Sequence, residues 1–446
     1  MSQVSVQSFQ GKPLIGEISP PGDKSISHRA LLLAALASGP GRLVGLAPGR
    51  DVAATARCLR ALGVVIRPDR PRGATIVRGR LDGDTLSGPA LREPQQILDC
   101  GNAGTTMRLL LGTLAGQALF AVLTGDRSLR RRPMGRVTGP LAEMGASFSG
   151  RDGGRLAPIA VRGGRLHPAA HRIPVASAQV KSAILLAGLF AEGATSVAEP
   201  APSRDHTERM LLAMGAEVRR ISATEASVSG PAMLSPLELT VPGDPSSAAF
   251  IAAASLLVPG SSVHIRGVSL NPGRMGFFEL LRRAGAGLSW EQTGVACGEP
   301  VGDIEARASA WGPLTVRPPE VPSMLDELPL VALLAARADG RSEISGAAEL
   351  RTKESDRLAG VASGLRALGV TLEERPDGLI IEGPSRLTSP VAPLPSAGDH
   401  RLAMTWAVAG LACRGNLRVA GMDSAAVSYP GFLDDIAALT GVRGRP

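Results

Sequence analysis

The sequence predicts an α/β protein of two similar domains, each built from three repeated βαβαβ-type units around buried parallel helices. Three observations support this prediction. One pattern of segments occurs six times, the first helix of each copy is apolar on every face, and a glycine ends each copy. A pattern that repeats in this way is typical of one supersecondary unit used several times.

Each copy begins with a polar turn and an apolar helix, and continues with a strand, a second polar loop and an amphipathic helix. In the first copy, PGDKSISHRALLLAALASG is followed by RLVGLAPGRDVAATARCLRALGV. A helix that is apolar all round must be buried all round. The mixed helices expected over 51–62 and 356–368 should instead lie outside. The copies end at Gly63, Gly145, Gly215, Gly285, Gly369 and Gly441.

Six units divide into two domains of three, and 446 residues are too many for one typical core. The fourth copy of the pattern begins at VPGDPSS. We therefore expect an N-terminal three-repeat domain over 21–242 and a C-terminal three-repeat domain made of 1–20 and 243–446. The strand before the first copy can pair with the C-terminal domain.

The charge and the composition of the chain indicate which classes of ligand it can bind. The net charge of +8 favours anionic ligands, but only 3% of the residues are aromatic, so base-stacking surfaces for nucleic acid are scarce. We expect small anionic ligands and no nucleic acid. The four cysteines form no C-x-x-C pair and the six histidines no H-E-x-x-H motif, which predicts a reducing compartment and no metal site. With no signal segment, no membrane-spanning run and no oligomerisation segment, we expect a cytoplasmic monomer.

The polar turns before the buried helices predict the functional site. A helix N-terminus attracts anions through its free N–H groups and its dipole. In PGDKSISHR, Asp23 or Ser25 can cap the helix, and Lys24 and Arg29 add positive charge. If the buried helices of a domain point the same way, these turns share one face, and two such faces can close over a ligand.

The expected face combines many cations with a few carboxylates, which suits two anionic substrates and an acid/base pair. Its members are Lys24, Ser25, Arg29, Asn102, Gly104, Thr105, Arg108, Arg132, Ser177, Gln179, Lys181, Arg204, Asp326, Glu327, Lys353, Glu354, Arg357, His400 and Arg401. Glu327, which is beside Asp326, is expected to be a structural partner rather than a second base. For His400, a catalytic contact and a capping or Asp-paired role both stay open.

Eight motifs now carry a resemblance. Along essentially its whole length, the chain contains in order the motifs PGDKSISHR, GNAGTTMR, RRRPMG, ASAQVKSA, SRDHTERM, DELP, RTKESDR and GDHRLAM. Together they resemble the 5-enolpyruvylshikimate-3-phosphate synthase family, and their sequences are similar to those of its bacterial class II branch. The resemblance implies the enolpyruvyl transferase fold. It also implies transfer of the enolpyruvyl group of phosphoenolpyruvate to the 5-hydroxyl of shikimate 3-phosphate, in the shikimate pathway to aromatic amino acids, without metal or organic cofactor.

The resemblance also implies roles for individual residues. Asp326 would be the base at the 5-hydroxyl, Glu354 would handle the methylene proton, and Lys24 would join them as a catalytic residue. The implied contacts of shikimate 3-phosphate are Lys24, Ser25, Arg29, Ser177, Ala178, Gln179, Arg204, Asp326 and Lys353. Those of phosphoenolpyruvate are Lys24, Asn102, Gly104, Arg132, Gln179, Arg357 and Arg401, with Lys353 also beside it.

Two positions are informative within the family. Ala178 stands where many members have a serine, so one hydroxyl contact is absent, as in the class II branch. Gly104 stands where an alanine in some class II members narrows the phosphoenolpyruvate pocket, so we expect sensitivity to glyphosate. The alternative is the sister family, UDP-N-acetylglucosamine enolpyruvyl transferase, which relies on a cysteine in a mobile loop. The matching loop here, GDRSLRRRPMG, has none.

Overall fold

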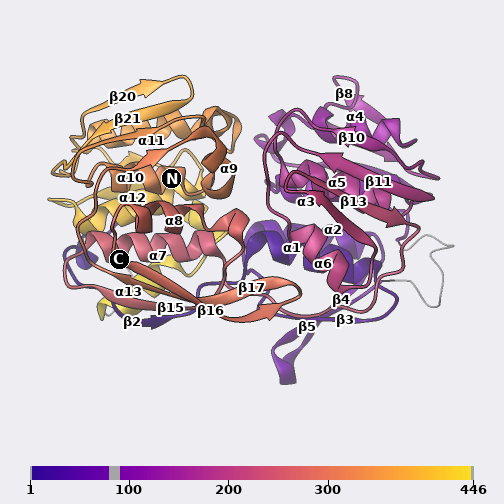
Figure 1. Ribbon diagram of the computed structural model, residues 1–446, viewed down its shortest axis with the longest axis horizontal. Coiled ribbons are helices and arrows are strands. Elements are labelled where there is room, and N and C mark those ends of the chain that lie inside the picture. Colours follow the sequence, from indigo (N-terminus) through magenta and orange to yellow (C-terminus); the bar gives the residue numbers. More distant parts are fainter. Residues whose placement is uncertain (1–2, 80–90, 443–446) are drawn as a thin grey trace. The chain divides into compact units, whose positions relative to one another are not determined.

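The repeating unit of the computed structural model is a strand, a buried helix, a second strand, an amphipathic helix and a closing β-hairpin. Residues 3–79 and 91–442 are described. They form two units (Figure 1). The N-terminal unit comprises 22–241 with 295–299, and the C-terminal unit comprises the described residues of 1–21, 242–294 and 300–446. The closing hairpin adds one strand to the βαβαβ pattern that the sequence predicts.

The N-terminal unit contains three repeats. The first consists of α1 (Lys24–Leu36), β3 (Gly41–Val44), α2 (Arg50–Ala61), β4 (Val65–Asp69) and β5 (Ala74–Arg78), and its first strand, β14 (Glu238–Thr240), comes from the end of the unit. The second consists of β6 (Leu98–Asp99), α3 (Gly104–Ala115), β7 (Phe120–Thr124), α4 (Gly135–Glu143), β8 (Ser147–Arg151) and β9 (Leu156–Arg162). The third consists of β10 (Ala170–Arg172), α5 (Ala178–Gly188), β11 (Gly193–Ala198), α6 (His206–Ala213), β12 (Val218–Ser222) and β13 (Glu225–Gly230).

The C-terminal unit repeats this order. Its first repeat consists of β2 (Ile15–Ile18), α7 (Pro245–Leu257), β15 (Ser262–Ser269), α8 (Gly276–Arg283), β16 (Leu288–Ala296) and β17 (Glu299–Arg307). The next consists of β18 (Thr315–Val316), α9 (Val321–Met324), α10 (Leu328–Ala335), β19 (Arg341–Ile344), α11 (Arg357–Ala367), β20 (Leu372–Arg375) and β21 (Gly378–Glu382). The last consists of β22 (Leu394–Pro395), α12 (His400–Ala412), β23 (Arg418–Ala420) and α13 (Phe432–Thr440), with β1 (Gln3–Ser5) beside β23.

The sheets follow one topology. The orders are β14-β3-β5-β4, β6-β7-β9-β8 and β10-β11-β13-β12 in the N-terminal unit, and β2-β15-β17-β16, β18-β19-β21-β20 and β22-β23-β1 in the C-terminal unit. The first two strands of each sheet run parallel, and the buried helix directly precedes the second of them in the chain. The third strand of each sheet runs antiparallel to the second. Leu239 of β14, for example, pairs with Leu43 of β3.

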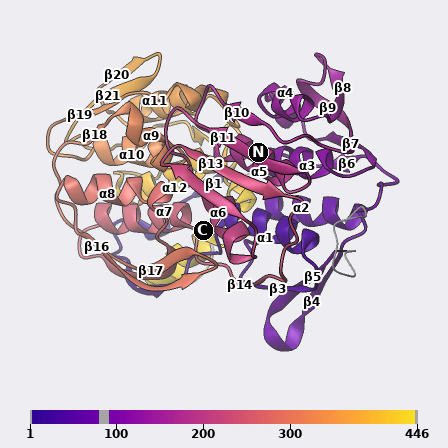
Figure 2. The same cartoon turned by 45° about the vertical axis from the view of Figure 1, so that its right-hand side comes forward.

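The apolar helices form the two cores. Every residue of α7 and of α10 is buried, as is every residue of α12 except the last, Ala412. Strands β20 and β21 and strands β15–β17 lie on opposite sides of α7, α10 and α12 (Figures 1 and 2). Each buried leucine or phenylalanine contributes about 1.5–3 kcal/mol. Within 3–79 and 91–442, no helix has both the length and the apolar character needed to cross a bilayer.

Two local features depart from the regular repeat. The fifth apolar helix is broken, because α9 ends at Met324 and α10 begins at Leu328, where Pro329 lacks the N–H that a longer helix would need. Asp326 lies in this break rather than on a helix face. In addition, the turn between β16 and β17 belongs to the N-terminal unit, where Glu299 lies 2.6 Å from Nδ1 of His206.

Candidate active site

The first two turns of α1 carry three of the predicted residues. The cap is Asp23, whose carboxylate accepts the N–H of Ile26 at 2.8 Å. This cap leaves the following side chains available for other contacts. Lys24 Nζ lies 3.3 Å from Asp51 Oδ2 at the start of α2, and the Lys24 side chain keeps 18% of its exposure. The carbonyl of Ser25 accepts from Arg29 Nη1 at 3.0 Å.

Arg29 is buried at the junction of α1, α5 and α6. Its Nε donates to Thr207 Oγ1 at 2.7 Å and its Nη2 to Ser182 Oγ at 2.8 Å. Burial lowers the pKa of Arg29 to about 10, and the positive charge of Arg204 works in the same direction. Arg29 and Arg204 therefore lie within electrostatic reach of each other, in one part of the N-terminal unit.

The loop before α3 joins two predicted residues directly. Asn102 donates from Nδ2 to Asp126 Oδ2 at 2.6 Å and accepts from Arg132 Nη2. Arg132 also donates to Ser128 Oγ at 3.3 Å. Asn102 and Arg132 thus form one hydrogen-bonded group that orients a guanidinium beside the helix start.

Gln179 and Gly104 extend this group. Gln179 Nε2 donates to Thr105 Oγ1 at 2.8 Å, and Gln179 Oε1 accepts from Arg108. A Cβ placed on Gly104 would lie 3.1 Å from Arg108 Nη1 and 3.2 Å from Arg132 Nη1. The glycine therefore leaves a small space between two guanidinium groups, and an alanine would intrude on both.

The start of α5 presents the remaining predicted residues of this unit. Ser177 is the cap of α5, and its hydroxyl accepts the N–H of Val180 at 3.5 Å. Ala178, the first residue of the helix, is half-buried and supplies no hydroxyl. Arg204 lies two residues before the start of α6.

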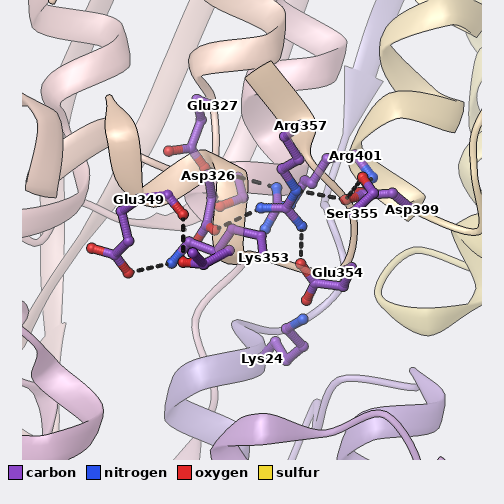
Figure 3. A network of polar contacts seen from close by, with 12 residues as sticks. Lys24, Asp326, Glu327, Glu349, Lys353, Glu354, Ser355, Arg357, Asp399 and Arg401 are labelled. Carbon is purple, nitrogen blue, oxygen red and sulfur yellow. Dashed lines mark hydrogen bonds and ion pairs between the residues drawn. The ribbon is translucent and has the colours of Figure 1, made fainter. Parts of the chain in front are cut away.

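In the C-terminal unit, Arg357 brings the two predicted acid/base residues together (Figure 3). This side chain is only 2% exposed. Its Nη1 lies 3.4 Å from Asp326 Oδ1, its Nη2 donates to Glu354 Oε2 at 2.6 Å, and its Nε donates to Asp399 Oδ2 at 2.7 Å. One guanidinium fork therefore spans three carboxylates.

The protonation state of Arg357 follows from these contacts. Burial opposes a charged side chain, but the three carboxylates, with Asp399 foremost, outweigh it and raise the pKa of Arg357. The arginine stays charged. Asp326 and Glu354 keep 24% and 21% of their side-chain exposure, and each has one oxygen beside the cation.

Asp399 organises the neighbouring helix. It caps α12 by accepting the N–H of Arg401 at 2.9 Å, and it accepts the hydroxyl of Ser355 at 3.1 Å. His400 is therefore not the cap of this helix. Arg401 Nη1 lies 3.8 Å from the buried Glu327, which supports the expected structural role of Glu327.

Lys353 has a partner on its own segment. Its ammonium lies 2.7 Å from Glu349 Oε1, one turn earlier, with 24% of the lysine side chain exposed (Figure 3).

The predicted residues thus fall into two sets, one in each unit. The sequence missed several partners, which are Asp51, Asp126, Glu199, Thr207, Glu349 and Asp399. For Asp399 a signal exists, since an aspartate directly before an apolar helix is a typical cap. Among the described residues, no group of three or more histidines, cysteines or acids could hold a metal ion.

Comparison with known proteins identifies the family. The sequence model of the family EPSP synthase (3-phosphoshikimate 1-carboxyvinyltransferase) matches residues 9–436. The chain belongs to the EPSP synthase family. It is 49% identical over 423 residues to a 3-phosphoshikimate 1-carboxyvinyltransferase of Desulforamulus reducens, covering 95% of this chain and 96% of the relative. It is 52% identical over 435 residues to the enzyme of that name from Gloeobacter violaceus, covering 97% and 98%.

Solved structures agree with this assignment to the EPSP synthase family. EPSP synthase from Acinetobacter baumannii superimposes with a TM-score of 0.86 at 38% identity, over 99% of both chains. The enolpyruvyl transferase NikO from Streptomyces tendae has a TM-score of 0.74 at 20% identity, over 98% of this chain and 96% of that one, a likeness of fold. The predicted enolpyruvyl transferase fold is confirmed.

Proposed function

We propose that this chain transfers the carboxyvinyl group of phosphoenolpyruvate to the 5-hydroxyl of shikimate 3-phosphate and releases phosphate, as a step toward aromatic amino acids. Membership of the EPSP synthase family supports the reaction. The observation that carries the mechanism is that Asp326 and Glu354 both contact the same buried guanidinium, which belongs to Arg357.

The proposed reaction has two stages. In the addition, Asp326 takes the proton of the 5-hydroxyl as its oxygen bonds to C2 of phosphoenolpyruvate, and Glu354 delivers a proton to C3, which becomes a methyl group. In the elimination, C3 returns a proton to Glu354, the C2–O bond to phosphate breaks, and phosphate leaves with the bonding electrons. The departing phosphate takes the proton that Asp326 holds, which restores both carboxyl groups to their starting states. A positioned acid or base contributes about 10²–10⁴ to the rate of such a step.

Binding needs cations from both sets. We propose that Lys24, Arg132, Arg357, Arg401 and Lys353 neutralise the carboxylate and phosphate of phosphoenolpyruvate, with Asn102, Gly104 and Gln179 shaping its surroundings. For shikimate 3-phosphate we propose Lys24, Ser25, Arg29, Ser177, Ala178, Gln179, Arg204, Asp326 and Lys353. Arginine forks bind such anions at two points, and helix N-termini add N–H donors.

The test is phosphate release from phosphoenolpyruvate, measured with and without shikimate 3-phosphate. The proposal expects release only when both are present, and none when UDP-N-acetylglucosamine replaces the shikimate. Release with UDP-N-acetylglucosamine would favour the sister activity, and no release with either acceptor would refute both. We further propose that the enzyme acts in the cytoplasm as a monomer, for which light scattering should give the mass of one chain.

A further inference from the structure

Glu199 is a buried carboxylate that the proposed mechanism does not use. It directly follows β11, and its side chain is only 1% exposed. Oε1 accepts the backbone N–H of Ser177 at 2.9 Å, and Oε2 accepts the hydroxyl of Ser203 at 2.7 Å. Oε2 also lies 2.9 Å from Nζ of Lys181. A carboxylate removed from water is tolerated only with such partners.

These donors belong to the two segments that carry proposed contacts of shikimate 3-phosphate. Ser177 caps α5 and precedes Ala178 and Gln179, whereas Ser203 directly precedes Arg204. The two segments are separated in sequence by the whole of α5 and β11. Glu199 therefore connects them through one side chain.

A lysine offsets part of the negative charge around Glu199. Lys181 Nζ lies 2.9 Å from Glu208 Oε1 as well, so its ammonium sits between two buried carboxylates. Burial opposes the charge of Lys181, but Glu208 and Glu199 together outweigh it and raise its pKa. Beside this pair, the hydroxyls of Ser182 and Thr207 lie 2.7 Å apart and both bind the guanidinium of Arg29.

We propose that Glu199 is a positioning residue for shikimate 3-phosphate: it fixes the segments before α5 and α6 so that Ser177 and Arg204 meet the same substrate. Glu199 itself touches no substrate. The inference deepens the proposed function and rests on it. Because phosphoenolpyruvate is assigned mainly to other residues, disturbing Glu199 should weaken binding of one substrate far more than the other.

The test replaces the carboxylate by its nearly isosteric amide. Glu199→Gln keeps an acceptor for one donor but places an amide NH₂ against another, or against the Lys181 ammonium. We expect the KM for shikimate 3-phosphate to rise about tenfold, the effect of losing one charge-assisted hydrogen bond, with kcat and the KM for phosphoenolpyruvate nearly unchanged. Glu192→Gln is the matched control, because Glu192 is 67% exposed and pairs with the exposed Arg165; it should behave as wild type.

Ser203→Ala gives a second, milder probe that removes only the 2.7 Å hydrogen bond. It should raise the KM for shikimate 3-phosphate about threefold, and calorimetry should show a rise of the same size in the Kd for shikimate 3-phosphate. If Glu199→Gln does not fold, the Ser203→Ala variant alone tests whether Glu199 positions the contacts of shikimate 3-phosphate. Lower unfolding temperatures with an unchanged KM for shikimate 3-phosphate, or equal rises for both substrates, would overturn the inference while leaving the proposed function intact. A wild-type enzyme without shikimate-dependent phosphate release would overturn both.

Discussion

Replacing Arg357 by lysine tests the arrangement of the proposed acid/base pair. Lysine keeps the positive charge but has one ammonium in place of a planar fork, so it cannot span Asp326, Glu354 and Asp399 together. Losing two charge-assisted hydrogen bonds at about 1.5 kcal/mol each amounts to about 3 kcal/mol. That free energy corresponds to roughly 10²-fold in kcat/KM for phosphoenolpyruvate.

The assay is steady-state phosphate release, with thermal unfolding measured on the same samples. Arg366→Lys is the matched control, because Arg366 lies on the same helix, is 48% exposed and pairs with Glu374 at 3.3 Å. Exposed pairs of this kind contribute about 0–1 kcal/mol, so the control should match wild type. A value of kcat/KM for Arg357→Lys within a few-fold of wild type would show that the guanidinium fork does not arrange the acid/base pair.

Three further predictions follow. Asp326→Ala should lower kcat about 10²–10⁴-fold while calorimetry still detects shikimate 3-phosphate binding; wild-type turnover would remove the base assignment. Gly104→Ala should raise both the KM for phosphoenolpyruvate and the inhibitory concentration of glyphosate, because the new methyl would lie 3.1 and 3.2 Å from two guanidinium nitrogens; an unchanged inhibition curve would contradict this. Asp303→Asn should destabilise the protein by about 1 kcal/mol at neutral pH. A backbone N–H, and then a histidine, lower the pKa of Asp303, so its contribution is present above the ordinary aspartate pKa of 3.8 and is lost as the pH falls through the lowered value; denaturant titrations showing an equal difference at the lowest pH would argue against it.

Local signals predicted much of the fold. Polar turns followed by apolar helices predicted the six buried helices, and either Asp23 or Ser25 was expected to cap α1, of which the structure selects Asp23. The hydrophobic pattern predicts buried helices and their caps because both depend on residues that are close together in the sequence. The broken helix around Asp326 has a local signal too, in Pro329.

Contacts between distant segments could not be predicted in this way. Asp399 meets Arg357 across 42 residues of sequence, and Glu299 meets His206 across 93. Glu199 gives no local signal, since its three donors are assembled only by the third repeat. The motifs indicate which residues carry chemistry, whereas the residues that hold them in place depend on tertiary packing.

The most direct test of the addition–elimination mechanism is the reaction run in D₂O with the product examined by NMR. Because the methylene carbon becomes a methyl group by taking a solvent-derived proton through Glu354, and then loses one, we expect deuterium in the vinyl methylene of the product and one phosphate per enolpyruvyl ether. Product formed without any deuterium at that carbon would contradict it.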